Sequence, residues 1–128
     1  MTAYLLDTHV LVWSAIASDR LSTPTVELLS DPGIEVFVSS VSIAEIVIKQ
    51  RLGKLQLPVA PLALIDELGM SELVFTGLHA QTVAELPLLH RDPFDRWLIA
   101  QAITEHLVLV TADAQIHRYD VDTLDPSS

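Results

Sequence analysis

The stretch that decides the fold is Tyr4-Leu-Leu-Asp-Thr-His-Val-Leu-Val-Trp13. Its first part, residues 4–6, is a short apolar run that predicts a buried β-strand. Residues 9–17 then carry the apolar side of a helix, and Asp7 stands at the junction between strand and helix. An acid directly behind a buried strand is a candidate site residue, because binding sites in open α/β sheets lie beyond the carboxyl ends of the strands.

The same alternation of short apolar strands and helices continues along the chain. Pro24, with Thr23 as its predicted N-cap, begins a second helix, and Gly53 is a natural end for the third. Further strands are predicted at residues 35–38, 73–75, 107–110 and 121–124, and further helices at 25–29, 40–52, 62–68, 78–85 and 93–105, with a short helix before the last strand. This pattern predicts an α/β fold with a mostly parallel sheet covered on both faces.

The length and composition favour one domain spanning residues 1–128. Half of the residues are hydrophobic and the mean hydropathy is +0.42, which argues against disorder and suggests apolar surface meant for a partner. There is no cysteine, so a disulfide scaffold, a thiol nucleophile and a zinc–thiolate site are excluded, and a reducing cytoplasm is compatible. The sequence shows neither a membrane-spanning run nor a signal peptide, and we expect a cytoplasmic protein without membrane contact.

The charge balance disfavours ordinary nucleic-acid binding. Seven Lys and Arg residues oppose seventeen Asp and Glu residues, which gives a formal net charge of −10. Phosphates favour basic surfaces. Carboxylates that hold divalent cations are the exception, because the metal reverses the local sign of the charge.

Four acids stand where such a site would form. Asp7 and Asp113 follow predicted strands, and Asp95 lies in the first turn of the helix that begins at Pro93. Glu45 is the only charged residue of the apolar run 41–48, where an unpaired buried carboxylate would cost several kcal/mol. A partner for Glu45 is therefore expected nearby.

Each of these acids also has a purely structural interpretation. An N-cap is worth about 1 kcal/mol, and a pair one helical turn apart roughly 0.2–0.5 kcal/mol. The structural candidates are Asp7 and Asp113 as caps, Asp92 with Asp95 as a capping pair, Ser42 with Glu45 as a capping box, and Glu45 with Lys49 as an ion pair. Capping, however, does not require the acids to meet at one end of the sheet.

If the four acids meet, they need a counter-charge, because carboxylates a few ångströms apart do not all stay ionised. Oxygen ligands without cysteine favour Mg²⁺ or Mn²⁺. Such ions lower the pKa of water and present it to phosphorus, which is the chemistry of phosphodiester hydrolysis.

The chain resembles the PIN domain, in particular the VapC-type toxin nucleases of VapBC toxin–antitoxin pairs. The resemblance rests on four strings in the order and at the spacing of that family. They are Leu5-Leu-Asp-Thr-His-Val-Leu-Val-Trp13, Ser42-Ile-Ala-Glu-Ile46 with Arg51-Leu-Gly-Lys-Leu55, His90-Arg-Asp-Pro-Phe-Asp-Arg96 followed by Leu98-Ile-Ala-Gln101, and Leu109-Val-Thr-Ala-Asp113.

The resemblance implies a three-layer α/β/α fold with a sheet of about five short strands. It implies that Asp7, Glu45, Asp95 and Asp113 hold Mg²⁺ or Mn²⁺ in an endoribonuclease that leaves a 5′-phosphate and a 3′-hydroxyl. It further implies a homodimer inhibited by a small VapB-type antitoxin that lays a basic segment across the acidic groove, which suits the −10 charge. Asp120, Asp122 and Asp125 have no role in this pattern.

Several neighbouring residues have two interpretations each. Thr8 and Thr111 would bond a carboxylate or serve as caps, and Arg96 would pair with Asp92 or contact a phosphate. His90 is expected to fix the local turn, with proton transfer as the alternative. His9 is expected beside the ligands and not among them.

The basic and aromatic residues are treated in the same way. Lys49, Arg51 and Lys54 would complement a helix C-terminus or contact the RNA backbone. Trp13 and Trp97 are expected to pack in the core or at an interface and not to stack on bases.

Two other functions compete with the nuclease. A non-catalytic module would use the same acidic groove to bind a basic peptide. A haloacid-dehalogenase-like phosphatase would use Asp7 as a nucleophile, but Asp7-Thr8-His9 lacks the second acid of that motif.

Overall fold

The structure is a computed structural model that describes residues 2–90 and 92–128. Arg91, within the string from His90 to Arg96, and Met1 lie outside the described residues. Along the chain, the elements are β1 (Ala3–Leu6), α1 (Thr8–Ile16), η1 (Ser18–Arg20), α2 (Thr23–Ser30), β2 (Glu35–Ser39), α3 (Ser40–Arg51), α4 (Pro61–Glu67), β3 (Ser71–Leu73), α5 (Gly77–Val83), α6 (Pro93–Glu105), β4 (Val108–Val110), η2 (Ile116–Arg118) and β5 (Thr123–Leu124).

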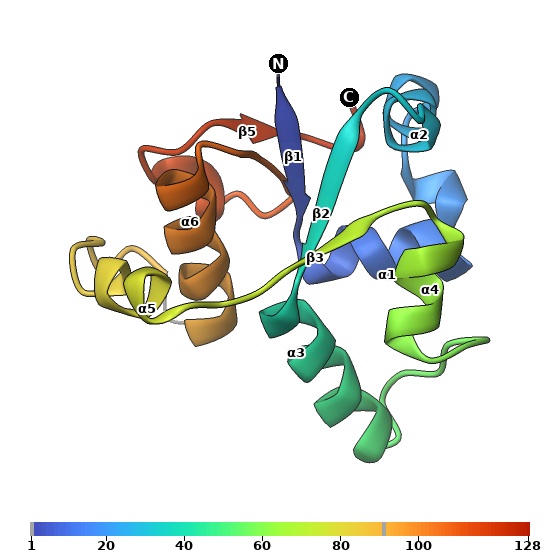
Figure 1. Ribbon diagram of the computed structural model, residues 1–128, viewed down its shortest axis with the longest axis horizontal. Helices are drawn as coiled ribbons and strands as arrows, with labels where there is room; N and C mark the ends of the chain where they lie inside the picture. The colour runs from blue at the N-terminus through green and yellow to red at the C-terminus, as the bar shows by residue number, and fades with distance from the viewer. Residues whose placement is uncertain (1, 91) are drawn as a thin grey trace.

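Within the described residues the strands form one five-stranded sheet of order β3-β2-β1-β4-β5. All four strand pairs are parallel. Figure 1 shows α1, α2 and α4 on one side of the sheet and α5 and α6 on the other. The predicted α/β fold, three-layered with a parallel sheet of about five strands, is confirmed.

The core forms on both faces of the central strand β1, because successive side chains of a strand point to opposite faces. Leu5 and Leu6 are both fully buried. Leu6 packs with the residues of α1, α2 and α4, whereas Leu5 packs with Leu98 and Ile99 of α6. Burying one such side chain contributes roughly 1.5–3 kcal/mol.

The strand order places a switch point between β1 and β4. The chain leaves β1 through α1 and α2 toward β2 on one side, and it reaches β4 through α5 and α6 on the other. Connections that depart to opposite faces leave a crevice at the carboxyl ends of the two strands. Leu6 pairs with Val110, so Asp7 and Thr111 emerge side by side at that crevice.

Three local predictions were wrong. The N-cap of α2 is Ser22 and not Thr23, because the helix already begins at Thr23 ahead of Pro24. Ser42 and Glu45 do not form a capping box, since Ser39 caps α3 and Ser42 lies inside it.

The third correction concerns a strand. The strand predicted at residues 73–75 is instead Ser71–Leu73, paired with β2 between Phe37 and Ser39. Phe75 has left the sheet, and its backbone N–H donates to the Ser40 hydroxyl at the start of α3.

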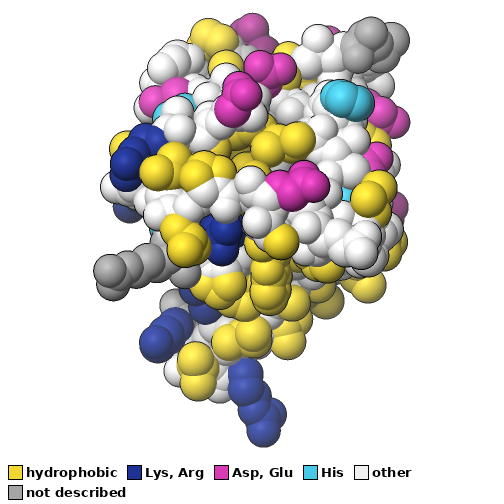
Figure 2. All heavy atoms as spheres, turned by 90° about the vertical axis from the view of Figure 1, so that its left-hand side faces the viewer, with side chains coloured by type: hydrophobic (Ala, Val, Ile, Leu, Met, Phe, Trp, Pro, Cys, Tyr) yellow, Lys and Arg dark blue, Asp and Glu magenta, His cyan; other side chains and the backbone are white. Residues whose placement is uncertain are grey.

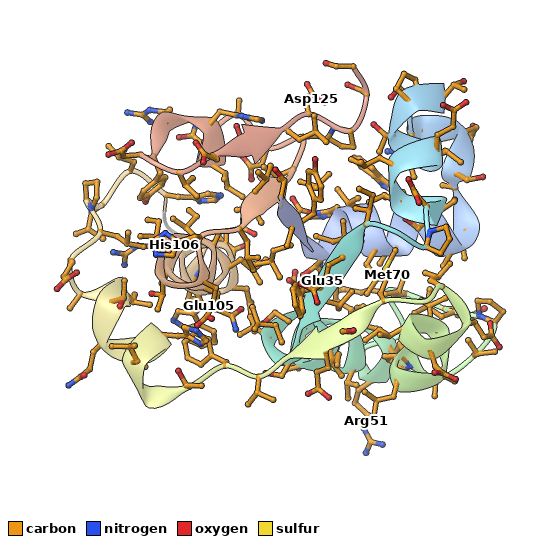
Figure 3. The ribbon with its side chains drawn as sticks, turned by 45° about the horizontal axis from the view of Figure 1, so that its top comes forward. Glu35, Arg51, Met70, Glu105, His106 and Asp125 are labelled. Carbon is orange, nitrogen blue, oxygen red and sulfur yellow. The ribbon has the colours of Figure 1, made fainter. Side chains whose placement is uncertain are left out.

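The charged side chains are spread unevenly over the surface. Figure 2 shows Asp and Glu in the upper half of one face, with some Lys and Arg among them, and further Lys and Arg at the lower end. Arg51, the last residue of α3, points away from the body of the molecule (Figure 3). Four apolar side chains of α3, α4 and the segment after α3 are also exposed, namely Val47, Ile48, Leu52 and Leu62. No helix in residues 2–90 and 92–128 has the length and apolar character needed to cross a membrane.

Candidate metal centre

Asp7 is held in place from both sides of its carboxylate. It caps α1 by accepting from the Val10 N–H at 3.1 Å through Oδ1. Its Oδ2 accepts from the Thr111 hydroxyl, which follows β4. The predicted capping role of Asp7 is therefore confirmed, and the cap fixes its carboxylate at the crevice.

Asp95 and Asp113 meet at an imidazole. Nε2 of His90 lies 2.9 Å from Oδ2 of Asp95 and 3.1 Å from Oδ2 of Asp113. Nδ1 of His90 accepts from the Asp92 N–H at 3.2 Å, so in the neutral ring Nε2 carries the proton and donates to the carboxylates. His90, Asp95 and Asp113 each offer one ligand atom, and these atoms lie within 4.8 Å of one another.

The pKa values show that negative charge accumulates here. The pKa of Asp95 is raised to about 7 by burial and then by the charges of Asp92, Asp7 and Asp113, although His90 opposes this. Burial also raises the pKa of Asp7, against the hydrogen bond from Thr111. Asp7, Asp95 and Asp113, which we call the acid cluster, therefore lie within electrostatic reach of one another.

In the described part of the chain, Glu45 is paired on one carboxylate oxygen and unpaired on the other. Its Oε2 forms the predicted ion pair with Lys49 at 3.0 Å. Its buried Oε1 has no hydrogen-bond partner among the described residues. Ser42, three residues earlier on the same helix face, accepts from the Thr8 hydroxyl at 2.9 Å, which turns this face of α3 toward the start of α1. The structure records no hydrogen bond between Glu45 and the acid cluster within residues 2–90 and 92–128.

These residues fit a hard divalent cation. The acid cluster supplies oxygen ligands, and burial together with the neighbouring carboxylates raises the pKa of Asp95, a shift that a bound cation would oppose. The orphaned Oε1 of Glu45 is a buried acceptor of the kind that a cation or its water would satisfy.

The neighbouring residues fall into different roles. Asp92 caps α6 by accepting from the Phe94 N–H at 2.9 Å. Arg96 does not serve as the expected partner of Asp92, because its Nη2 donates to the backbone carbonyls of Val83 and Leu86. Val83 is the last residue of α5 and Leu86 lies shortly after it, so Arg96 connects the end of α5 to α6.

Sequence reasoning missed the full role of His90. Its predicted effect on the local turn is confirmed by its bond to the Asp92 N–H, but its bridge to Asp113 spans 23 residues. Tyr119 was missed altogether. Its buried hydroxyl accepts from the N–H groups of Leu89 and His90, at 3.1 and 2.9 Å. No local pattern signals either contact.

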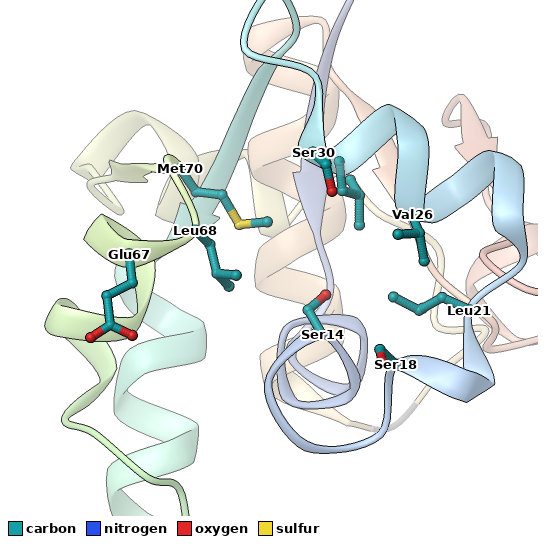
Figure 4. A pocket seen from close by; sticks show the side chains of 9 residues that line it. Ser14, Ser18, Leu21, Val26, Ser30, Glu67, Leu68 and Met70 are labelled. Atoms are coloured by element: carbon teal, nitrogen blue, oxygen red, sulfur yellow. The ribbon is translucent and has the colours of Figure 1, made fainter.

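Two clefts differ in their chemistry. One of about 250 Å³ is lined by Asp7, His9, Trp13, Ala112 and Asp113. Another of about 320 Å³ lies between α1, α2 and α4, with Glu67 and Met70 on one side and Val26 on the other (Figure 4). None of the four candidate acids lines this second cleft, so the first is the one that adjoins the acid cluster.

Comparison with known proteins agrees with this architecture. Residues 4–122 match the family described as PIN domain. The chain is 30% identical over 124 residues to Ribonuclease VapC22 of Mycobacterium tuberculosis (strain ATCC 25618 / H37Rv), covering 93% of this chain and 95% of the relative.

Two solved structures show the same fold. VapBC2 from Rickettsia felis, bound to a DNA fragment from its promoter, has a TM-score of 0.74 at 19% identity and covers 96% of this chain and 98% of its own. VapBC-1 from nontypeable Haemophilus influenzae has a TM-score of 0.72 at 18% identity and covers 99% and 100%. With a family match over nearly the whole length and the acids at the switch point of the sheet, this chain belongs to the PIN domain family.

Proposed function

We propose that this chain is a metal-dependent endoribonuclease, the toxin of a type II toxin–antitoxin pair. The observation that carries the proposal is the acid cluster at the crevice between β1 and β4, where the pKa of Asp95 is raised to about 7. The family membership and the related VapC22 ribonuclease support it.

Asp7, Glu45, Asp95 and Asp113 would hold Mg²⁺ or Mn²⁺. When bound, such an ion supplies Lewis acidity to the phosphate and lowers the pKa of water. Thr111 and the Val10 N–H keep the Asp7 carboxylate oriented, and His90 holds Asp95 beside Asp113. Together these contacts fix negative charge at the crevice. This charge would repel a phosphodiester unless a divalent cation reversed the local sign. The products would carry a 5′-phosphate and a 3′-hydroxyl.

The test is cleavage of total RNA by purified protein in Mg²⁺, in Mn²⁺ and in excess chelator. We expect discrete fragments that require metal and disappear in Asp95→Asn. Circular dichroism should show that this variant is folded, because Asn keeps the size of the side chain. Metal binding is measured separately by calorimetry.

The matched control is Asp66→Asn, since Asp66 is an exposed acid on α4. It should cleave as the parent does. Equal cleavage by Asp95→Asn and the parent would refute the assignment of Asp95. Metal binding without any cleavage would favour the alternative, a non-catalytic module that binds a basic peptide in the acidic groove.

We further propose a VapB-type antitoxin as the partner and a homodimer as the free state. Two structural neighbours are VapBC assemblies, and a net charge of −10 suits a basic inhibitory segment. The cysteine-free chain would act in the cytoplasm. Sedimentation of the purified chain tests the dimer, and a monomer at micromolar concentration would exclude it.

A further inference from the structure

The cleft beside the acid cluster has an aromatic side. His9 and Trp13 lie one helical turn apart on α1, and their ring centroids are 6.3 Å apart at an interplanar angle of 45°. Both line the cleft of about 250 Å³ together with Asp7, Ala112 and Asp113. Two carboxylates of the acid cluster and two aromatic rings therefore share one cavity.

The two rings differ in how much of their surface is exposed to a ligand. His9 is exposed, whereas Trp13 is half-buried and also packs against the core cluster of α1, α2 and α4. The expected packing role of Trp13 is thus confirmed, but part of its side chain remains accessible. The core holds the ring in place, and the part of the ring that lines the cleft is a rigid platform for a planar ligand.

A cation adjoins the same platform. The guanidinium carbon of Arg20 lies over the Trp13 ring, 5.4 Å from its centroid. The chain has only seven Lys and Arg residues, so a positive charge here is uncommon on this acidic surface. It favours a polyanion that passes the cleft.

We propose that His9 and Trp13 form a subsite for one unpaired nucleobase of the RNA, next to the scissile phosphate. This rests on the proposed nuclease function, because the phosphate would sit at the acid cluster and its attached base would reach the adjoining rings. Proteins hold single-stranded nucleic acid by stacking bases on aromatic side chains, and this attraction does not depend on net positive charge. It therefore offers an acidic protein a way to hold RNA.

The two tryptophans allow a direct test. Trp13 lines the cleft, whereas Trp97 packs against Phe75 and Phe94 on the other side of the sheet. Nitrogen-15 NMR follows the two indole N–H signals while the parent protein in Mg²⁺ is titrated with AMP, CMP, GMP or UMP. Ribose 5-phosphate is the probe that lacks a base.

We expect nucleotides to shift the Trp13 signal and leave that of Trp97 in place, and ribose 5-phosphate to shift neither. His9→Asn should weaken nucleotide binding by about fivefold or more, the factor that corresponds to one stacking contact. Trp13→Leu should do so too, and His9→Asn remains informative if Trp13→Leu fails to fold. The control is His106→Asn, an exposed histidine at the end of α6 with φ +57°, which Asn tolerates.

Several results would overturn the subsite. They are equal shifts with ribose 5-phosphate, equal shifts of both indoles, no shift while Mg²⁺ still binds, or equal affinities of His9→Asn and His106→Asn. Failure of the nuclease proposal looks different, because RNA cleavage would be absent while Trp13 still responded to nucleotides.

Discussion

The surroundings of Asp95 on balance disfavour the negative charge of its carboxylate. Its pKa is raised from 3.8 to about 7 by burial and by Asp92, Asp7 and Asp113, with His90 opposing them. Between these two pH values the folded protein binds a proton that the unfolded chain has released. Stability from this proton is full below the unfolded pKa and is lost as the pH rises through the folded one.

We therefore predict that metal-free protein loses stability as the pH rises from about 4 to about 7. Asp95→Asn should flatten this dependence and raise the melting temperature at pH 8. Urea unfolding in chelator at several pH values measures both effects. Adding Mg²⁺ at pH 8 should stabilise the parent more than Asp95→Asn, and an unchanged pH slope in the variant would contradict the prediction.

The Tyr119 hydroxyl connects two loops near the site. It accepts from two backbone N–H groups, those of Leu89 and His90, and so fixes the segment that carries the His90 imidazole. Tyr119 follows η2, whereas His90 precedes α6, and the two segments are distant in sequence.

Tyr119→Phe should cost roughly 1–3 kcal/mol of unfolding free energy, because it leaves two amides without their acceptor. It should also speed hydrogen exchange at the amides of Leu89 and His90, which NMR resolves. Tyr4→Phe is the matched control, since Tyr4 is the other tyrosine and packs against the core. If the two variants lose equal stability, the hydroxyl of Tyr119 does not hold the Leu89–His90 segment in place.

At the level of elements, the end of α3 depends on one backbone conformation. Gly53 follows the C-cap Leu52 with φ +73°, a left-handed value that costs other residues about 1–2 kcal/mol. A Cβ added at Gly53 would meet nothing within 4 Å, so crowding plays no part. The same open space surrounds Gly77 at the start of α5, where φ is not positive.

Gly53→Ala should therefore lower the unfolding free energy by about 1 kcal/mol, whereas Gly77→Ala should leave it unchanged or slightly higher. Chemical denaturation of both variants measures the difference. Equal effects would show that backbone conformation does not decide the stability of this helix end.

The whole molecule is built around one sheet. Its two core clusters lie on opposite faces of β1 and share that strand through Leu5 and Leu6. Because both clusters contain side chains of β1, unfolding of this strand would disrupt both of them. We propose that residues 1–128 fold as a single domain.

Calorimetry should then show one unfolding transition of roughly 90 kcal/mol near 60 °C, at about 0.7 kcal/mol per residue. The calorimetric and van't Hoff enthalpies should agree. Two resolved transitions, or a van't Hoff enthalpy well below the calorimetric one, would mean that the two faces unfold separately.

Local chemistry allowed much of this molecule to be predicted from its sequence. The helix at Pro93–Glu105 was predicted with the bounds that the structure has, because proline favours a helix start and Asp92 is a strong cap. The positions of Asp7 and Asp113 behind strands follow from the same short-range pattern, and parallel strands carry their ends to one edge. Hydrophobic periodicity and capping act within a few residues, so one sequence suffices to detect them.

Contacts across the chain were decided by the tertiary structure alone. The hydrogen bond from Thr111 to Asp7 spans 104 residues. Arg96 donates to carbonyls at and just after the end of α5, and not to the nearby acid Asp92. The bounds of β3 likewise depend on its register with β2. The bridge of His90 between Asp95 and Asp113, and the raised pKa of Asp95, also exist only once the strands and α6 have packed, because burial and charge act through space and not along the chain.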